Sequence, residues 1–163
     1  MHNIRSLVEV LNRHFVKESD DFCRDQLLDT LGALADESSL PIFEYLMRKT
    51  DRRDERRILL AAKNYVRPEF KDYLSNVFES DSSEKSHRIF AAWGLAKLGN
   101  CEAYEYLVMM LDDPEKTIKA EGTITYDPGQ SVRAAQAISD INGWNFTWGK
   151  SSVDLIRVRL SSA

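Results

Sequence analysis

The chain has 163 residues, of which 43% are hydrophobic and 29% are charged, and its formal net charge is −4. This length and apolar content suffice for one domain with a full core and exclude an intrinsically disordered chain. No stretch approaches the ~20 uninterrupted apolar residues of a membrane span, and the N-terminus has no apolar signal region. The acidic balance disfavours nucleic-acid binding, which depends on Lys and Arg. We therefore expect a cytoplasmic protein that binds neither nucleic acid nor membrane.

The chain begins with a helical pattern. Apolar residues between Ile4 and Leu11 recur at the spacing i, i+3, i+4, i+7, which indicates an amphipathic helix. The pattern continues as helices of about 10–15 residues, separated by polar breaks such as 36–39 and 80–83. Only Thr123–Tyr126 has clear strand character, and with Ile118 and Ala120 before Glu121-Gly122 it predicts a small β-hairpin.

Two short sequence motifs alternate along the chain. Copies of the first, made of small and apolar residues, begin at Leu27, Ala61, Ala91 and Ala134. The second, an acidic residue followed by Tyr and Leu, ends at Leu46, Leu74 and Leu107. Two alternating motifs with a period of about 30 residues predict a stack of repeats with two helices each. The expected repeats are about 4–36, 38–66, 68–99 and 101–143, and a C-terminal helix near 150–161 is expected to cover the open end.

The third and fourth repeats carry a more specific pattern. Residues 87–100 contain paired alanines and a Leu-Gly step, residues 101–114 form a second helix ending in Leu-Asp-Asp-Pro, and Ser131–Ala135 contains a Val-Arg start. This pattern resembles the HEAT-like repeat shared with phycobilin lyase-type helical repeats. The resemblance implies an all-α fold in a single domain, 1–163. That fold is a right-handed stack of about four HEAT-like helical hairpins, with the small β-hairpin inserted in the last repeat and a terminal capping helix.

Aligning the repeats indicates which residues face a partner. Ala91, Ala92 and Gly94 are expected to let neighbouring helices approach closely, while two other positions of each inner helix point toward the concave surface. The predicted partner-binding residues are Asp29, Lys63, Trp93 and Gln136 from the first position, Arg67, Lys97 and Asp140 from the second, and Tyr126 from the hairpin. An exposed Trp93 has the character of an interface hot spot. The alternative, that Trp93 packs in the core, stays open at this point.

The sequence contains no phosphate-binding glycine loop, zinc-binding His-Glu-x-x-His helix or Gly-x-Ser-x-Gly elbow. Cys23 and Cys101 are isolated and are expected to be reduced and buried, and His87 is expected to be a packed or hydrogen-bonded structural residue. The mixed charges of Thr50–Arg57 indicate a helix start with internal ion pairs. We expect no catalytic residue, metal or cofactor.

These features favour a non-catalytic protein-binding module over an enzyme. The most concrete hypothesis is an immunity protein, an antitoxin of a contact-dependent growth inhibition or similar toxin system, which masks a basic, nuclease-like toxin. An adaptor or assembly factor is the alternative in the same class. A phycobilin lyase-like enzyme would require a chromophore pocket. A HEAT-like DNA-repair glycosylase would require a basic concave face, which the charge count disfavours.

Overall fold

The computed structural model describes residues 2–49, 54–113, 118–120, 123–125, 129–144 and 150–162. Within these residues the regular secondary structure is helical apart from two three-residue strands, which confirms the predicted all-α class. The helices are α1 (His2–Lys17), α2 (Asp21–Leu34), α3 (Leu40–Arg48), α4 (Glu55–Tyr65), α5 (Lys71–Glu79), α6 (Lys85–Lys97), α7 (Cys101–Met110), α8 (Gln130–Ile141) and α9 (Lys150–Ser161). The 3-10 helices η1 (Glu37–Ser39) and η2 (Pro68–Phe70) precede α3 and α5.

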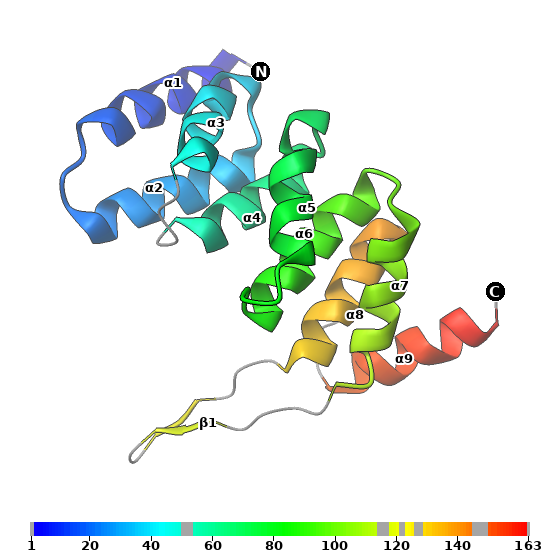
Figure 1. Ribbon diagram of the computed structural model, residues 1–163. Helices are drawn as coiled ribbons and strands as arrows, with labels where there is room; N and C mark the ends of the chain where they lie inside the picture. The colour runs from blue at the N-terminus through cyan, green and yellow to red at the C-terminus, as the bar shows by residue number, and fades with distance from the viewer. Residues whose placement is uncertain are drawn as a thin grey trace.

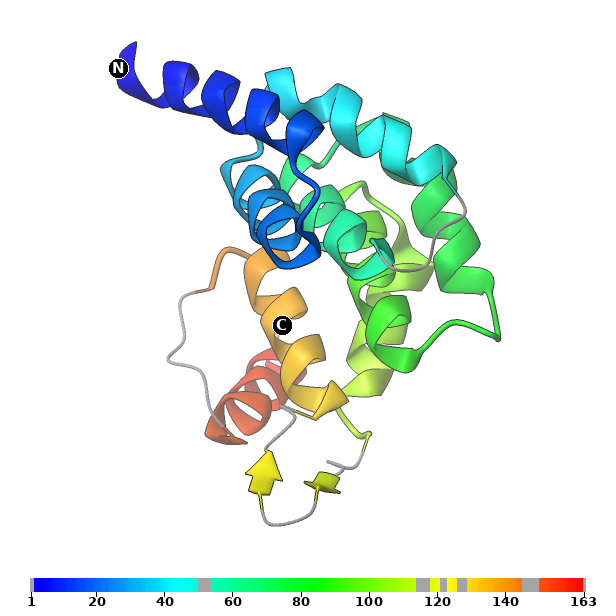
Figure 2. The same cartoon turned by 90° about the vertical axis from the view of Figure 1, so that its left-hand side faces the viewer.

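The helices alternate between two layers. Helices α2, α4, α6 and α8, which we call the inner helices, each contact the next one in the row. Helices α1, α3, α5 and α7, the outer helices, pack against them, and α9 contacts α8. Figure 1 shows this row running from α1 at one end to α9 at the other, and Figure 2 shows the same succession from the side. The row therefore brings side chains from three consecutive inner helices onto one surface.

All four inner helices end in the same way. Each is followed within two residues by a left-handed residue, namely Ala35 (φ 47°), Val66 (φ 48°), Gly99 (φ 88°) and Gly143 (φ 66°). A left-handed residue after the last turn lets backbone N–H groups satisfy the free carbonyls of that turn. The N–H of Val66, for example, donates to the carbonyl of Ala62 at 3.1 Å. Glycine adopts this conformation freely, whereas β-branched valine does so at a cost.

Glycines set the closest approaches between helices. A Cβ added to Gly94 of α6 would lie 2.8 Å from Cδ1 of Leu74 in α5, and one added to Gly32 of α2 would lie 3.0 Å from Cβ of Ala61 in α4. These contacts confirm the close packing predicted for Gly94. The surrounding core includes fully buried large residues from every inner helix and from α3, α5 and α7.

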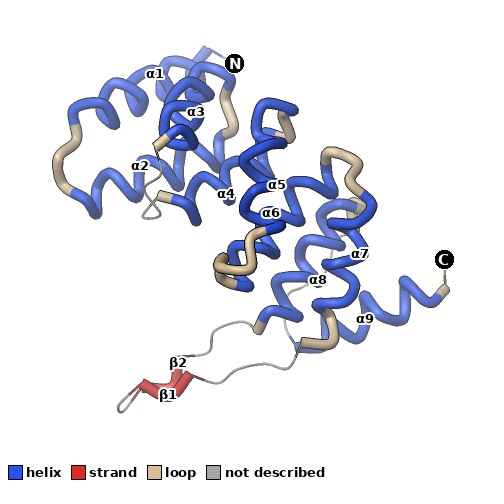
Figure 3. The backbone as a smooth tube through the Cα atoms, in the orientation of Figure 1, coloured by secondary structure: helices blue, strands red, loops and turns tan. Residues whose placement is uncertain are grey.

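The two strands lie between α7 and α8 in the sequence. Strands β1 (Ile118–Ala120) and β2 (Thr123–Thr125) pair in antiparallel register, with Ile118 opposite Thr125 and Ala120 opposite Thr123. Figure 3 shows both strands projecting away from the helices. Tyr126, a predicted partner-binding residue, lies outside the described residues.

Candidate functional site

An open cleft of about 550 Å³ lies across α4, α6 and α8. Its lining residues are Arg56, Leu60, Lys63, Asn64, Phe90, Trp93, Arg133, Gln136 and Asp140. The set contains four of the predicted partner-binding residues, contributed by three inner helices. The row of inner helices therefore assembles one site from residues up to 84 positions apart in the sequence.

Helical periodicity explains why each helix contributes a stripe. On α4 the lining residues Arg56, Leu60 and Lys63 are spaced by four and three positions, so they share one helix face. On α8, Arg133, Gln136 and Asp140 follow the spacing of three and four. Phe90 and Trp93, three positions apart, form the stripe on α6. The cleft thus has aromatic side chains at its centre and charged side chains on either side.

A hydrogen-bonded network holds these helices together at the cleft. The indole Nε1 of Trp93 donates to Oδ2 of Asp140 at 2.8 Å, and Lys97 Nζ lies 2.6 Å from the same oxygen. Lys97 also donates to the backbone carbonyl of Lys63 at 3.1 Å. Charge-assisted bonds of this kind are among the stronger polar contacts in proteins. Lys97 therefore links α4, α6 and α8, although it does not itself line the cleft.

Lys63 is a half-buried cation within the cleft. Its Nζ lies 4.3 Å from the centroid of the Trp93 ring, within the range of a cation–π interaction, and donates to Oδ1 of Asn64 at 3.0 Å. Burial lowers the pKa of Lys63, because desolvation disfavours the ammonium form; nearby Asp140 raises that pKa and Lys97 lowers it further. The net direction is downward. The cleft therefore holds a lysine whose charge an incoming anion would stabilise.

Trp93 is a core residue with one edge at the cleft. Its side chain is only 7% exposed, because Lys63 covers its ring and Asp140 binds its nitrogen. The expectation of a residue pointing freely outward is therefore wrong, and the alternative of a packed Trp93 is correct. Its contribution to the site is to position Lys63 and Asp140.

The other predicted residues do not line this cleft. Asp29 of α2 lines an adjoining smaller cleft of about 210 Å³, which shares Arg56, Leu60, Lys63 and Asn64 with the first. Its Oδ1 lies 3.9 Å from Nε of Arg57. Arg67 follows α4 and forms an ion pair with Glu37 of η1. The repeat alignment grouped these residues with the cleft residues because they occupy equivalent positions along their helices. An equivalent position does not specify which residue of the preceding helix lies opposite.

The repeat alignment missed five cleft residues, namely Arg56, Leu60, Asn64, Phe90 and Arg133. Arg56 lies seven positions before Lys63 on the same helix face, and Arg133 lies seven before Asp140, so the helical spacing contained the signal. The segment around Arg56 contains both acidic and basic residues, so it was interpreted as a helix start with internal ion pairs and not as part of a binding site.

The charged residues that the structure describes within Thr50–Arg57 contact other helices. Residues 50–53 lie outside the described residues. In the described part, Arg57 pairs with Asp25 of α2 at 2.8 Å, and Asp54 lies 3.6 Å from Arg24. His87 Nδ1 lies 3.5 Å from Oε1 of Glu55, which agrees with the structural role predicted for His87. The described part of this segment therefore makes contacts that join α2, α4 and α6, because these helices pack side by side.

The prediction that both cysteines are buried is wrong. Cys23, in the first turn of α2, and Cys101, at the start of α7, are free and exposed. First-turn positions project beyond the packed middle of a helix, where solvent reaches them. Asp20 caps α2 by accepting from the N–H of Cys23, and the hydrogen bond between the Asp20 and Cys23 side chains raises the pKa of the thiol.

Among the described residues, no group of three or more His, Cys, Asp or Glu side chains is placed to hold a metal ion. None of the described helices combines the length and apolar character needed to cross a membrane. No protein-family model and no curated protein matches the sequence.

Proposed function

We propose that the helices form four HEAT-like repeats, α1–α2, α3–α4, α5–α6 and α7–α8, with α9 covering the open end and β1–β2 forming a hairpin insertion in the last repeat. The row of inner helices supports this assignment, because each contacts the next. The left-handed residue that follows each inner helix also supports it, since only about a third to a half of helices in general end in this way. In such a stack, the inner helices form an extended surface suited to binding.

On this basis, we propose that the protein is a non-catalytic protein-binding module in the cytoplasm, and that its partner docks on the inner helices. The cleft across α4, α6 and α8 is the observation that carries the proposal. It presents arginine side chains, which are enriched at the energetic centres of protein interfaces, beside the small exposed edges of Phe90 and Trp93. A protruding partner side chain can enter this open depression. Its position at the middle of the row lets a partner contact several repeats at once.

The contents of the cleft support binding over catalysis. The described lining residues include no Ser, Thr, Cys or His, and the amine of Lys63 is engaged by Asn64 and by the Trp93 ring. Asp140 is held by Trp93 and Lys97, so its carboxylate is committed to a structural network. A phycobilin lyase-like activity is the enzymatic alternative. Titrating the protein with an open-chain tetrapyrrole tests it, and we expect no change in the chromophore absorption spectrum.

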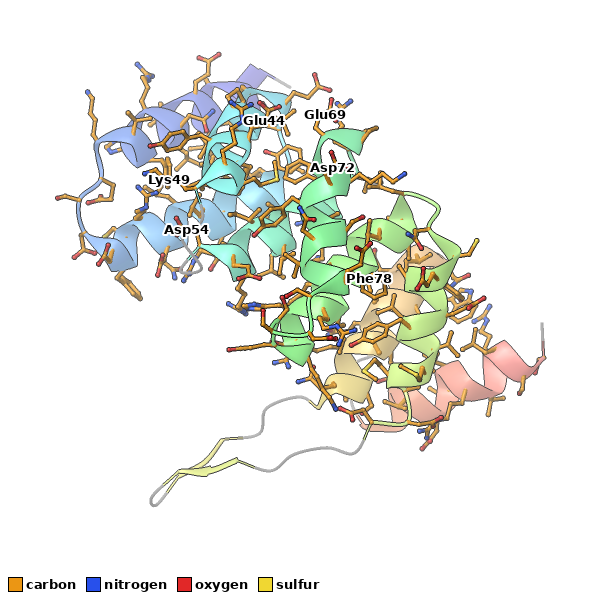
Figure 4. All side chains as sticks on the ribbon, viewed as in Figure 1. Glu44, Lys49, Asp54, Glu69, Asp72 and Phe78 are labelled. Carbon is orange, nitrogen blue, oxygen red and sulfur yellow. The ribbon has the colours of Figure 1, made fainter. Side chains whose placement is uncertain are left out.

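The immunity-protein hypothesis, with a basic nuclease-like toxin as partner, requires an acidic surface. One outer helix provides such a surface: α7 carries Glu102 and Glu105, both exposed, and contains no Lys or Arg. Glu69 of η2 and Asp72 of α5, which are labelled in Figure 4, are further exposed acidic residues of the outer layer, on either side of the exposed Lys71 in the sequence. Electrostatic complementarity with a basic protein favours these outer helices as its docking surface. Toxin masking through the outer helices is therefore the second candidate function, with an adaptor role as its alternative.

Site-specific photo-crosslinking separates the two candidates. A photoreactive amino acid placed at Gln136 reports on the inner helices, and the same amino acid at Glu105 reports on α7; neither side chain is part of the fully buried core. Irradiation in the native cells should yield a discrete protein adduct from position 136 and none from position 105. An adduct from position 105 alone would favour toxin masking, and no adduct from either position would refute protein binding by this chain.

A further inference from the structure

The inner-helix cleft is positively charged although the chain as a whole is acidic. Arg56, Lys63 and Arg133 line it, and Asp140 is the one acidic residue among its described lining residues. The whole chain has a formal net charge of −4, so the cleft has the opposite sign to the protein that contains it. A local reversal of sign in a depression concentrates the electrostatic field there.

Asp140 cancels only part of the charge of the cleft cations, because it is shared between Lys63, whose pKa it raises, and Lys97. Its Oδ2 atom receives Lys97 Nζ at 2.6 Å and Trp93 Nε1 at 2.8 Å, and Lys97 lies outside the cleft lining. Lys97 therefore compensates part of the charge of Asp140. Arg56 is exposed and forms no hydrogen bond or ion pair with any other described residue, so its guanidinium donors face the open cleft and solvent.

We propose that this cleft binds an acidic peptide segment of the protein partner, with an Asp or Glu carboxylate held by Arg56 and Lys63. This inference rests on the proposed protein-binding function and specifies the chemistry of the partner. The planar guanidinium of Arg56 matches a carboxylate in a two-point hydrogen-bonded fork. Leu60 and Phe90, which also line the cleft, provide apolar walls for the methylene groups and neighbouring residues of the segment.

The surroundings of the cleft favour a peptide carboxylate over a nucleic-acid backbone. A nucleic acid presents a regular series of phosphates and is bound by a continuous track of cations. Here the track is interrupted on the α2 side, where the neighbouring smaller cleft contains Asp29 and where Asp25 pairs with Arg57. A single acidic side chain requires only the local cluster at α4 and α8.

The protonation of Lys63 gives this binding a characteristic pH dependence. Burial lowers the pKa of Lys63, and a bound carboxylate would raise it by stabilising the ammonium form. Binding therefore favours the protonated lysine, so affinity should fall as the pH rises through the lowered pKa of Lys63. An acidic segment bound elsewhere on the protein would not show this link to Lys63.

The test uses the full chain as the target for a library of phage-displayed random peptides. We expect the selected peptides to be enriched in Asp and Glu, and we expect a fluorescein-labelled selected peptide to bind in an anisotropy titration. Arg56→Ala should weaken that peptide about tenfold, as expected for the loss of a charge-assisted contact. Arg48→Ala is the matched control, because Arg48 is an exposed arginine on the outer helix α3, and it should leave the affinity unchanged.

Three outcomes would overturn the proposal. One is a selected pool without acidic enrichment, the second is equal binding by Arg56→Ala and Arg48→Ala, and the third is tighter binding of a fluorescein-labelled single-stranded oligonucleotide than of any selected peptide. A protein adduct from position 136 together with a non-acidic peptide pool would refute only the acidic segment and leave the proposed function standing. Circular dichroism of Arg56→Ala should match that of the original protein, since this side chain is exposed and makes no contact that the fold requires.

Discussion

Truncating Trp93 to alanine should destabilise the fold strongly. Trp93 is 7% exposed, and a tryptophan side chain buries roughly 200 Å² of surface. At ~25 cal/mol per Å² this burial contributes up to about 5 kcal/mol, and truncations of buried aromatic residues generally cost ~3–5 kcal/mol. The variant also removes the indole donor to Asp140 and the ring beneath Lys63. We therefore expect a loss of about 3–5 kcal/mol in the free energy of unfolding.

Urea unfolding followed by circular dichroism measures this loss directly. For a chain of this size, it corresponds to a melting temperature lower by about 6–20 °C. Phe22→Ala is the matched control, because Phe22 is also an aromatic residue on an inner helix but is 71% exposed. Its free energy of unfolding should change by no more than ~0.5 kcal/mol. If Trp93→Ala unfolded within that same range, Trp93 would be a surface residue and the geometry of the cleft described above would be incorrect.

Three further substitutions test the packing, the helix ends and the charge of the cleft. Gly94→Ala should destabilise the protein by about 1 kcal/mol in urea unfolding. Overpacking against buried Leu74 costs ~1–3 kcal/mol, and the better helix propensity of alanine offsets ~1 kcal/mol of that cost. A net stabilisation would show that α5 and α6 separate easily. Val66→Gly should stabilise it by about 0.5–1 kcal/mol, since relief of the left-handed valine exceeds the entropy cost of glycine; a lower melting temperature would contradict this. Burial lowers the pKa of Lys63 from its ordinary value of 10.5. At pH values between the lowered pKa and 10.5, the unfolded chain therefore binds more protons than the folded chain. The original protein should therefore gain stability relative to Lys63→Met as the pH rises toward about 10. Urea unfolding at several pH values measures the difference in free energy of unfolding between the two proteins. A difference that does not change with pH would refute the burial of this charge.

Local sequence patterns determined the helical character of the chain. Apolar residues at helical spacing, few glycines and prolines, and polar breaks are properties of neighbouring residues, so they are readable without knowing the fold. The close approach at Gly94 was predictable for the same reason, because a glycine among alanines marks a helix surface without side-chain bulk. These features depend on contacts within one helix or between adjacent helices.

The candidate site depended on contacts that the sequence does not specify. Lys63, Trp93, Gln136 and Asp140 were predicted from equivalent positions in the repeats, and the structure brings all four to one cleft. The same reasoning grouped Arg67 with them, although Arg67 pairs with Glu37 of η1 away from the cleft. Equivalent positions share a direction on their own helices, but the neighbour opposite each one differs.

The sequence by itself therefore determined the all-α class and identified the helix faces from which the cleft is built. Only the tertiary structure decided that Trp93 is buried, that Asp140 is paired with Lys97, and that Arg56 faces an open cleft. Burial and charge pairing depend on the distances between side chains of different helices, and those distances are set when the helices pack. A chain with a net negative charge can consequently present a positively charged cleft, because its carboxylates and its cations are sorted onto different surfaces by folding.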